Sequence, residues 1–164
     1  MTSFHGQHSI AGTRRGGPAT FAASSPLDGT TLPGRFCLAS VTDADDAVRA
    51  AAAAFPSFAA ASGLARATLL EGIAEEILAL GDGLIDRARR ETALPEARLV
   101  GERGRTVGQL RLFAALARDG SWCDARIDPA QPDRQPLPRA DIRRVKVPLG
   151  PVIVLMPPLA MNKR

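Results

Sequence analysis

The stretch Ser62–Leu84, with the sequence SGLARATLLEGIAEEILALGDGL, decides the fold of the central part of the chain. Its large apolar residues recur at steps of three and four, which is the spacing of one face of an α-helix; they are Leu69, Leu70, Ile73, Ile77, Leu80 and Leu84. Ser62 has a hydroxyl suited to capping the start of a helix. We expect a helix that starts there, is weakened or bent at Gly81 and Gly83, and continues through Leu84–Arg90.

Two more helices are expected on either side of this stretch. Upstream, Thr42 is the expected N-cap of a helix with acidic residues in its first turn and an alanine-rich run after it. Pro56 lies inside that pattern and is expected to end or kink the helix. Downstream, Leu94–Glu96 opens a third helix that stops at Asp119–Gly120. Its apolar stripe consists of Leu99, Val107, Leu110, Phe113, Ala114 and Ala117.

Short strands are expected at the front of the chain. Ser25–Gly29 is a turn, because its proline presets φ and its glycine accepts a positive φ. The flanking runs Ala19–Ala23 and Arg35–Ser40 fit a small antiparallel pair.

An extended link and two strands are expected behind the helices. Residues 124–141 are polar and contain four prolines, which indicates an extended connector. Ile142–Val147 alternates enough for a strand, and Val152–Leu155 is a β-branched run typical of a buried strand. The order is therefore small strands, three helices, a link and two strands, which is an α/β chain.

The composition excludes several classes of protein. The chain has 164 residues, suited to one domain with or without an appendage, and 45% hydrophobic residues, too many for a wholly disordered protein. The net charge is +4, but acidic and basic residues are interleaved and aromatics make up only 4%, so nucleic-acid binding is not expected. Prolines interrupt the most apolar run, Val147–Met161, and Met1–Ile10 has no apolar signal sequence. We expect a cytoplasmic protein without a membrane segment.

Few residues suggest catalytic chemistry or metal binding. His5 and His8 lie in an expected frayed terminus without a neighbouring carboxylate. Cys37 and Cys123 form no CxxC pair, and Cys123 beside Trp122 lacks a nearby His that would lower its pKa, so we interpret both as structural thiols.

Three further sets of residues also favour structural roles. Gly101, Gly104 and Gly108 match no phosphate-binding motif and are interpreted as allowing close helix packing. Glu75 and Glu76 are adjacent on a helix and point in different directions. The remaining set is a solvated basic face with some carboxylate pairing, formed by Arg98, Arg103, Arg105, Arg111 and Arg118.

Three stretches resemble one known family. They are Gly101–Phe113 (GERGRTVGQLRLF), Ile127–Asp133 (IDPAQPD) and Val147–Val154 (VPLGPVIV). Together they resemble the N-terminal part of the aldehyde dehydrogenase superfamily, and within it the 2-oxoglutarate semialdehyde (2,5-dioxopentanoate) dehydrogenases. The resemblance runs from about residue 9 to residue 154, and its GERGRT run is more specific than the widely shared PxGPV element.

The resemblance implies a fold and a reaction. Family members oxidise an aldehyde to an acid with NAD or NADP, using a cysteine nucleophile and a glutamate that activates water. On this template, residues 1–123 would be the N-terminal part of the cofactor-binding domain. Residues 124–147 would be an extended link and an oligomerisation strand. Residues 148–164 would hold the first strand of a Rossmann-like sheet and a divergent, truncated end.

The departures from the family concern its functional residues. The chain ends LMPPLAMNKR, and without a gap Leu159 occupies the position of the family's oxyanion-binding asparagine; Asn162 lacks the Phe-Pro that follows that asparagine. The family's nucleophile, base and cofactor-binding lysine would lie beyond Arg164, and Cys37 and Cys123 do not match the catalytic motif. We therefore expect no catalytic, cofactor-binding or metal-binding residue, no NAD or NADP bound by this chain alone, and an inactive N-terminal fragment.

A fragment of this kind would leave the apolar faces of its helices partly exposed. We expect it to associate with itself or with a full-length aldehyde dehydrogenase subunit. The alternative function is therefore an interaction module that pairs with such a subunit through its helices or through the strand Ile142–Val147.

Overall fold

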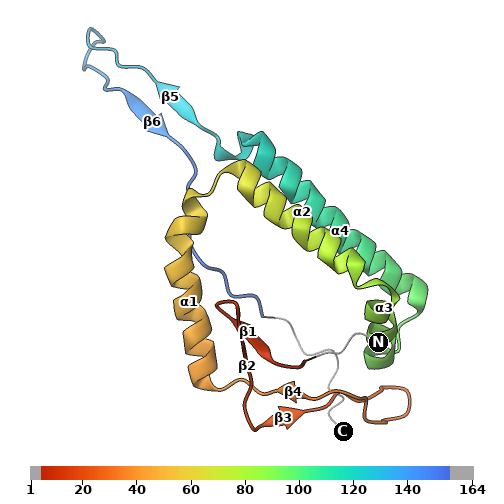
Figure 1. Cartoon of the computed structure of the whole chain (residues 1–164). Coiled ribbons are helices and arrows are strands. Elements are labelled where there is room, and N and C mark those ends of the chain that lie inside the picture. Colours follow the sequence, from red (N-terminus) through yellow and green to blue (C-terminus); the bar gives the residue numbers. More distant parts are fainter. Residues whose placement is uncertain (1–4, 156–164) are drawn as a thin grey trace.

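Four helices lie between short antiparallel hairpins in the computed structural model, which describes residues 5–155 (Figure 1). The first hairpin joins β1 (His8–Ile10) to β2 (Thr13–Arg15). Its two-residue loop has positive φ at both positions, the geometry of a type I′ turn. The expectation of a frayed terminus is wrong for His8, which pairs with Arg15 in this hairpin.

The predicted antiparallel pair is confirmed, with shorter strands. β3 (Thr20–Phe21) pairs with β4 (Phe36–Cys37). The predicted turn lies between them: the Gly29 amide donates to the Ser25 carbonyl at 2.9 Å, and Gly29 has a φ of +74°.

Helix α1 (Val41–Ala60) begins at a different cap from the predicted one. The N-cap is Ser40, not Thr42: the Ser40 hydroxyl accepts from the Asp43 amide at 3.1 Å, and the Asp43 carboxylate accepts from the Ser40 amide at 2.9 Å. This reciprocal arrangement satisfies two backbone donors at the start of the helix. Pro56 does not end the helix, which continues to Ala60, because a proline removes only one backbone donor from the ladder.

The stretch predicted as one bent helix is two helices. α2 (Gly63–Ala79) starts at the predicted cap, where the Ser62 hydroxyl accepts from the Ala65 amide at 3.1 Å. Gly81 has a φ of +58°, which breaks the helix, and α3 (Gly81–Thr92) continues in a new direction (Figure 1). The structure therefore has four helices where the sequence predicted three.

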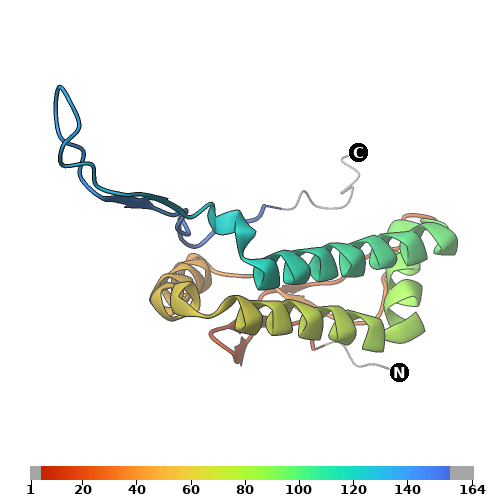
Figure 2. The same cartoon turned by 90° about the horizontal axis from the view of Figure 1, so that it is seen from above.

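Helix α4 (Glu96–Asp119) starts after Pro95 and ends at Gly120, close to the predicted bounds. It packs against α2 in the antiparallel direction and also contacts α3 (Figures 1 and 2). The fully buried residues of this seam are small and spaced by seven: Ala67 and Ala74 on α2, and Val107 and Ala114 on α4. Small side chains at this spacing let two helix backbones approach closely.

The apolar stripes predicted for these helices are only partly buried. Leu70, Ile77 and Leu110 are half-buried beside the seam. Leu84 and Leu99 are also half-buried. Four large members of the stripes are exposed by 41–53%: Leu69, Ile73, Leu80 and Phe113. The helical periodicity was therefore predicted correctly, but no element among residues 5–155 covers these four side chains.

The C-terminal part forms a projecting arm. After a short 3-10 helix, η1 (Ser121–Cys123), strand β5 (Arg126–Asp128) pairs with β6 (Ile142–Arg144). This hairpin extends away from the helices (Figures 1 and 2). β6 confirms part of the predicted strand. The segment 124–141 is not simply a connector, because it supplies β5.

The predicted buried strand Val152–Leu155 is not observed. These four residues lie outside any strand and are 72–88% exposed. No described strand lies beside them to accept their backbone hydrogen bonds. Leu159 and Asn162, whose place in the family pattern was considered above, lie outside the described residues.

Candidate functional site

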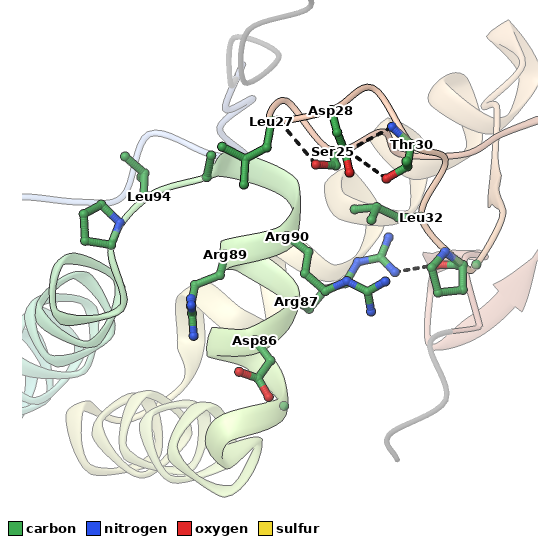
Figure 3. A pocket seen from close by; sticks show the side chains of 15 residues that line it. Ser25, Leu27, Asp28, Thr30, Leu32, Asp86, Arg87, Arg89, Arg90 and Leu94 are labelled. Carbon is green, nitrogen blue, oxygen red and sulfur yellow. Dashed lines mark hydrogen bonds between the residues drawn. The ribbon is translucent and has the colours of Figure 1, made fainter.

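The larger hollow of the molecule lies between the loop of residues 25–34 and helix α3 (Figure 3). Its volume is about 1020 Å³. The loop wall is ordered by short-range hydrogen bonds. Asp28 accepts from the Thr30 amide at 3.1 Å and from its hydroxyl at 2.8 Å, and these bonds lower the pKa of Asp28. Ser25 and Leu32 are buried behind this wall.

The α3 wall of this hollow is rich in arginine. Arg87 is held by the Pro33 carbonyl and by Glu91, and Arg89 donates to Glu96 at 3.1 Å. The described residues that line the hollow include no histidine or cysteine, and the Thr30 hydroxyl in its lining is bonded to the Asp28 carboxylate. Gly83, in the first turn of α3, also lines the hollow.

A second, apolar groove of about 390 Å³ separates α1 from residues 148–152. Phe55 and Phe58 line it from the helix, and Pro148, Pro151 and Val152 line it from the chain that follows β6. Its one charged side chain is Arg66 of α2. The groove therefore offers apolar contact but no group suited to catalysis.

The two histidines do not come together with other reactive groups. The His5 Nδ1 atom accepts from the Gln7 amide at 3.1 Å. His8 lies in β1, and its Nε2 atom is buried without a hydrogen-bond partner among the described residues. Across residues 5–155, no group of three or more His, Cys, Asp or Glu side chains has the arrangement of a metal site.

The two cysteines are separate, half-buried free thiols. Cys37 belongs to β4 and Cys123 to η1. No hydrogen bond joins either thiol to a base within the part of the chain that the structure describes.

The three glycines of α4 do not have the predicted packing role. A Cβ atom added at Gly101, Gly104 or Gly108 would meet nothing within 4 Å. The close approach between helices instead occurs at Gly63, where an added Cβ would lie 2.2 Å from the Ala117 carbonyl oxygen. Gly63 can be seen in the sequence beside the cap Ser62, but the packing role was predicted for the three glycines of α4 instead.

The predicted basic face is confirmed as a set of paired side chains. Arg98 and Arg105 both donate to Glu102 and lower the pKa of its carboxyl group, with Arg105 contributing most. Two further pairs, Arg111 with Glu75 and Arg118 with Glu71, cross from α4 to α2. The remaining member, Arg103, donates to the Gly81 carbonyl at 3.0 Å. All of these carboxylates are at least one-third exposed, so the pairs contribute little stability each.

The structure thus brings none of the candidate residues into a catalytic arrangement. In addition, none of the helices in the described ranges is both long and apolar enough to cross a membrane. What distinguishes the molecule is its exposed apolar surface and its projecting hairpin (Figure 2).

Comparison with known proteins identifies the family to which the chain belongs. Residues 14–161 match the model of the aldehyde dehydrogenase family. Alpha-ketoglutaric semialdehyde dehydrogenase 2 of Azospirillum brasilense is 54% identical over 140 residues, which cover 85% of this chain and 27% of that protein. The alpha-ketoglutaric semialdehyde dehydrogenase of Acinetobacter baylyi is 47% identical over 119 residues, covering 73% of this chain and 23% of that protein.

Solved structures show the same relation. An NAD-dependent benzaldehyde dehydrogenase from Corynebacterium glutamicum superposes with a TM-score of 0.69 at 20% identity, covering 79% of this chain and 28% of that enzyme. PnpE from a Pseudomonas species superposes with a TM-score of 0.64 at 27% identity, covering 78% and 26%. The chain spans about a quarter of the length of the proteins it matches. It belongs to the aldehyde dehydrogenase family.

Proposed function

We propose that this chain is the N-terminal, non-catalytic part of an aldehyde dehydrogenase that oxidises 2-oxoglutarate semialdehyde. The observation that supports this substrate is the 54% identity, over 85% of the chain, to a protein named for that aldehyde. In the proposed reaction the aldehyde and water give the acid, and NAD or NADP takes up the hydride. The proposal includes a cytoplasmic location, with which two unpaired cysteines are consistent.

The proposed role of this chain is structural rather than chemical. Neither hollow is lined by a histidine or a cysteine, which supports this role. Cys37 and Cys123 are free thiols in a two-residue strand and a short 3-10 helix, and no base is bonded to either among the described residues. The helices and the hairpin would instead supply packing surfaces to the remainder of the fold.

The test is an assay of NADH or NADPH formation at 340 nm (the absorbance of the reduced cofactor) with the purified chain and 2-oxoglutarate semialdehyde. We expect no aldehyde-dependent rate above a protein-free control. The double variant Cys37→Ala/Cys123→Ala provides the control for residual thiol chemistry. A rate that needs the aldehyde and disappears in this variant would overturn the non-catalytic role.

The second candidate function is an interaction module that pairs with a full-length aldehyde dehydrogenase subunit or a second copy of this chain. The observation that favours it is the β5–β6 hairpin, whose six residues are all exposed and which projects away from the helices (Figure 2). Exposed strand edges accept a further strand through backbone hydrogen bonds. Co-purification with a full-length dehydrogenase, lost when residues 126–144 are replaced by a short glycine-serine loop, would support this function. A monomer that binds no dehydrogenase would contradict it.

A further inference from the structure

The chain contains three Asp–Gly pairs, and the fold places them in different surroundings. They are Asp28–Gly29, Asp82–Gly83 and Asp119–Gly120. In such a pair the glycine nitrogen can attack the carboxyl carbon of the aspartate side chain, because glycine has no Cβ atom to hinder the approach. The attack requires a glycine amide that is not held by an acceptor and a carboxyl group that is not held by donors. The hydrogen bonds around each pair therefore decide which one reacts.

The pair Asp28–Gly29 is held by hydrogen bonds on both sides. The Gly29 amide donates to the Ser25 carbonyl at 2.9 Å. The Asp28 carboxylate accepts from the Thr30 amide at 3.1 Å and from the Thr30 hydroxyl at 2.8 Å. These bonds, the one from the Thr30 amide first, lower the pKa of Asp28 and keep its carboxyl group ionised, which leaves no hydroxyl group to depart as water.

The pair Asp119–Gly120 is held in the same way at the end of α4. The Gly120 amide donates to the Leu116 carbonyl at 3.2 Å. The Asp119 carboxylate accepts from the Ser121 amide at 3.0 Å. Hydrogen bonds from the side chain and the amide of Ser121 lower the pKa of Asp119. Like the first pair, this one must break at least two hydrogen bonds before it can react.

The pair Asp82–Gly83 has neither protection. Both residues are exposed and lie in the first turn of α3. The amides of a first turn have no carbonyl acceptor within their own helix, and no side chain caps this turn. Among the described residues, no hydrogen bond or ion pair holds the Asp82 carboxylate. Because Asp82 stands between Gly83 and Gly81, which has a φ of +58°, the turn opens at low cost.

We propose that Asp82 is the residue of this chain that converts to isoaspartate. The Gly83 nitrogen forms a bond to the side-chain carboxyl carbon of Asp82, and its proton leaves with the carboxyl hydroxyl group as water, which gives a cyclic succinimide. Water then adds to one of the two imide carbonyls. Opening at the former side-chain carbonyl restores aspartate, whereas opening at the main-chain carbonyl routes the backbone through the former side chain.

The product changes the turn between α2 and α3 (Figure 1). It has one extra backbone carbon beside Gly81, whose carbonyl accepts from Arg103 of α4 at 3.0 Å. The modification would therefore alter how α3 is held against α4. This inference goes beyond the proposed function and does not depend on it.

The experiment incubates the full chain at neutral pH, both folded and unfolded in urea, and follows its tryptic peptides by chromatography and mass spectrometry. The three pairs fall on the separate peptides 16–35, 67–87 and 119–126. An isoaspartyl peptide keeps its mass, elutes at a different time and resists cleavage at the altered residue by a protease specific for aspartate. In the folded chain we expect isoaspartate to form in 67–87 about tenfold faster than in the other peptides, because those pairs must first lose two hydrogen bonds. In urea the three rates should converge.

Gly83→Ala adds a side chain to the attacking residue and is expected to slow the reaction in this peptide about tenfold. Gly72→Ala is the matched control, because it makes the same substitution in the same peptide at a site where the added Cβ meets nothing within 4 Å, and it should leave the rate unchanged. Faster reaction at Asp28 or Asp119, no isoaspartate at Asp82 in the folded chain, an unchanged rate in Gly83→Ala, or the same order of rates in urea would overturn the proposal.

Discussion

Gly63→Ala is expected to destabilise the chain because of one contact at the seam between α2 and α4. The added Cβ would lie 2.2 Å from the Ala117 carbonyl oxygen and 3.3 Å from its carbonyl carbon. Both are backbone atoms of the facing helix, so the helices must separate or tilt to admit the methyl group. Overpacking of this kind costs about 1–3 kcal/mol. The better helix propensity of alanine returns at most about 1 kcal/mol.

With the full propensity gain subtracted, the net loss in the free energy of unfolding is about 0–2 kcal/mol, equivalent to a melting temperature lower by up to about 8 °C for a chain of this size. Gly72→Ala is the matched control, because an added Cβ in the middle of the same helix meets nothing within 4 Å. That variant is expected to gain about 0.5–1 kcal/mol from propensity alone.

The assay is urea unfolding followed by the fluorescence of Trp122, the only tryptophan of the chain. Its ring lies 5.5 Å from the Arg66 guanidinium, close to the end of the seam where Gly63 lies, so its emission reports on this contact. We expect the urea midpoint to fall for Gly63→Ala and to rise for Gly72→Ala. Equal shifts in the two variants, or a stabilised Gly63→Ala, would refute the close approach of the two helix backbones.

Three further predictions concern single side chains. Ser40→Ala removes the cap of α1 and is expected to cost about 1 kcal/mol in urea unfolding, whereas Thr42→Ala leaves the midpoint unchanged; the reverse order would refute the assigned cap. Ala74→Leu overfills a fully buried position and is expected to cost about 1–3 kcal/mol; a stabilised variant would show that the seam has free space. Arg118 lowers the pKa of Glu71 below its ordinary 4.5, so the stability that Glu71 contributes is complete above pH 4.5 and is lost as the pH falls through the lowered pKa. The difference in urea midpoint between the unaltered chain and Glu71→Gln should therefore shrink on acidification. A difference that stays constant with pH would contradict the pairing.

The sequence predicted the helices well because helical periodicity is a local property. The stripe in Ser62–Leu84 and the cap at Ser62 marked α2 correctly, and Asp119–Gly120 marked the end of α4. The break at Gly81 was underestimated, because the sequence does not show that this glycine adopts a positive φ. The seam itself was missed: alanines line it, and periodicity arguments give weight to large apolar residues.

The strands were harder to predict, because a strand depends on its neighbours. β5 lies in a proline-rich segment, and it is a strand because β6 pairs with it in the antiparallel direction. Val152–Leu155 has the composition of a buried strand but no neighbour among the described residues, so it stays extended and exposed. The same reason explains why large leucine and isoleucine side chains of the predicted stripes face solvent.

The family was recognisable from short motifs, whereas the candidate residues could be judged only in three dimensions. Gly101, Gly104 and Gly108 had the appearance of packing positions, yet they face open space. The expectation that this chain holds no catalytic, cofactor-binding or metal-binding residue stays a prediction.

The most direct measurement is isothermal titration calorimetry of the purified chain with NAD and with NADP. If the groups that hold the dinucleotide lie outside this chain, neither titration will show saturable heat at dinucleotide concentrations up to the millimolar range. Stoichiometric binding of either dinucleotide, weakened by substitution of Arg89 or Arg90 in the arginine-rich hollow, would contradict the account.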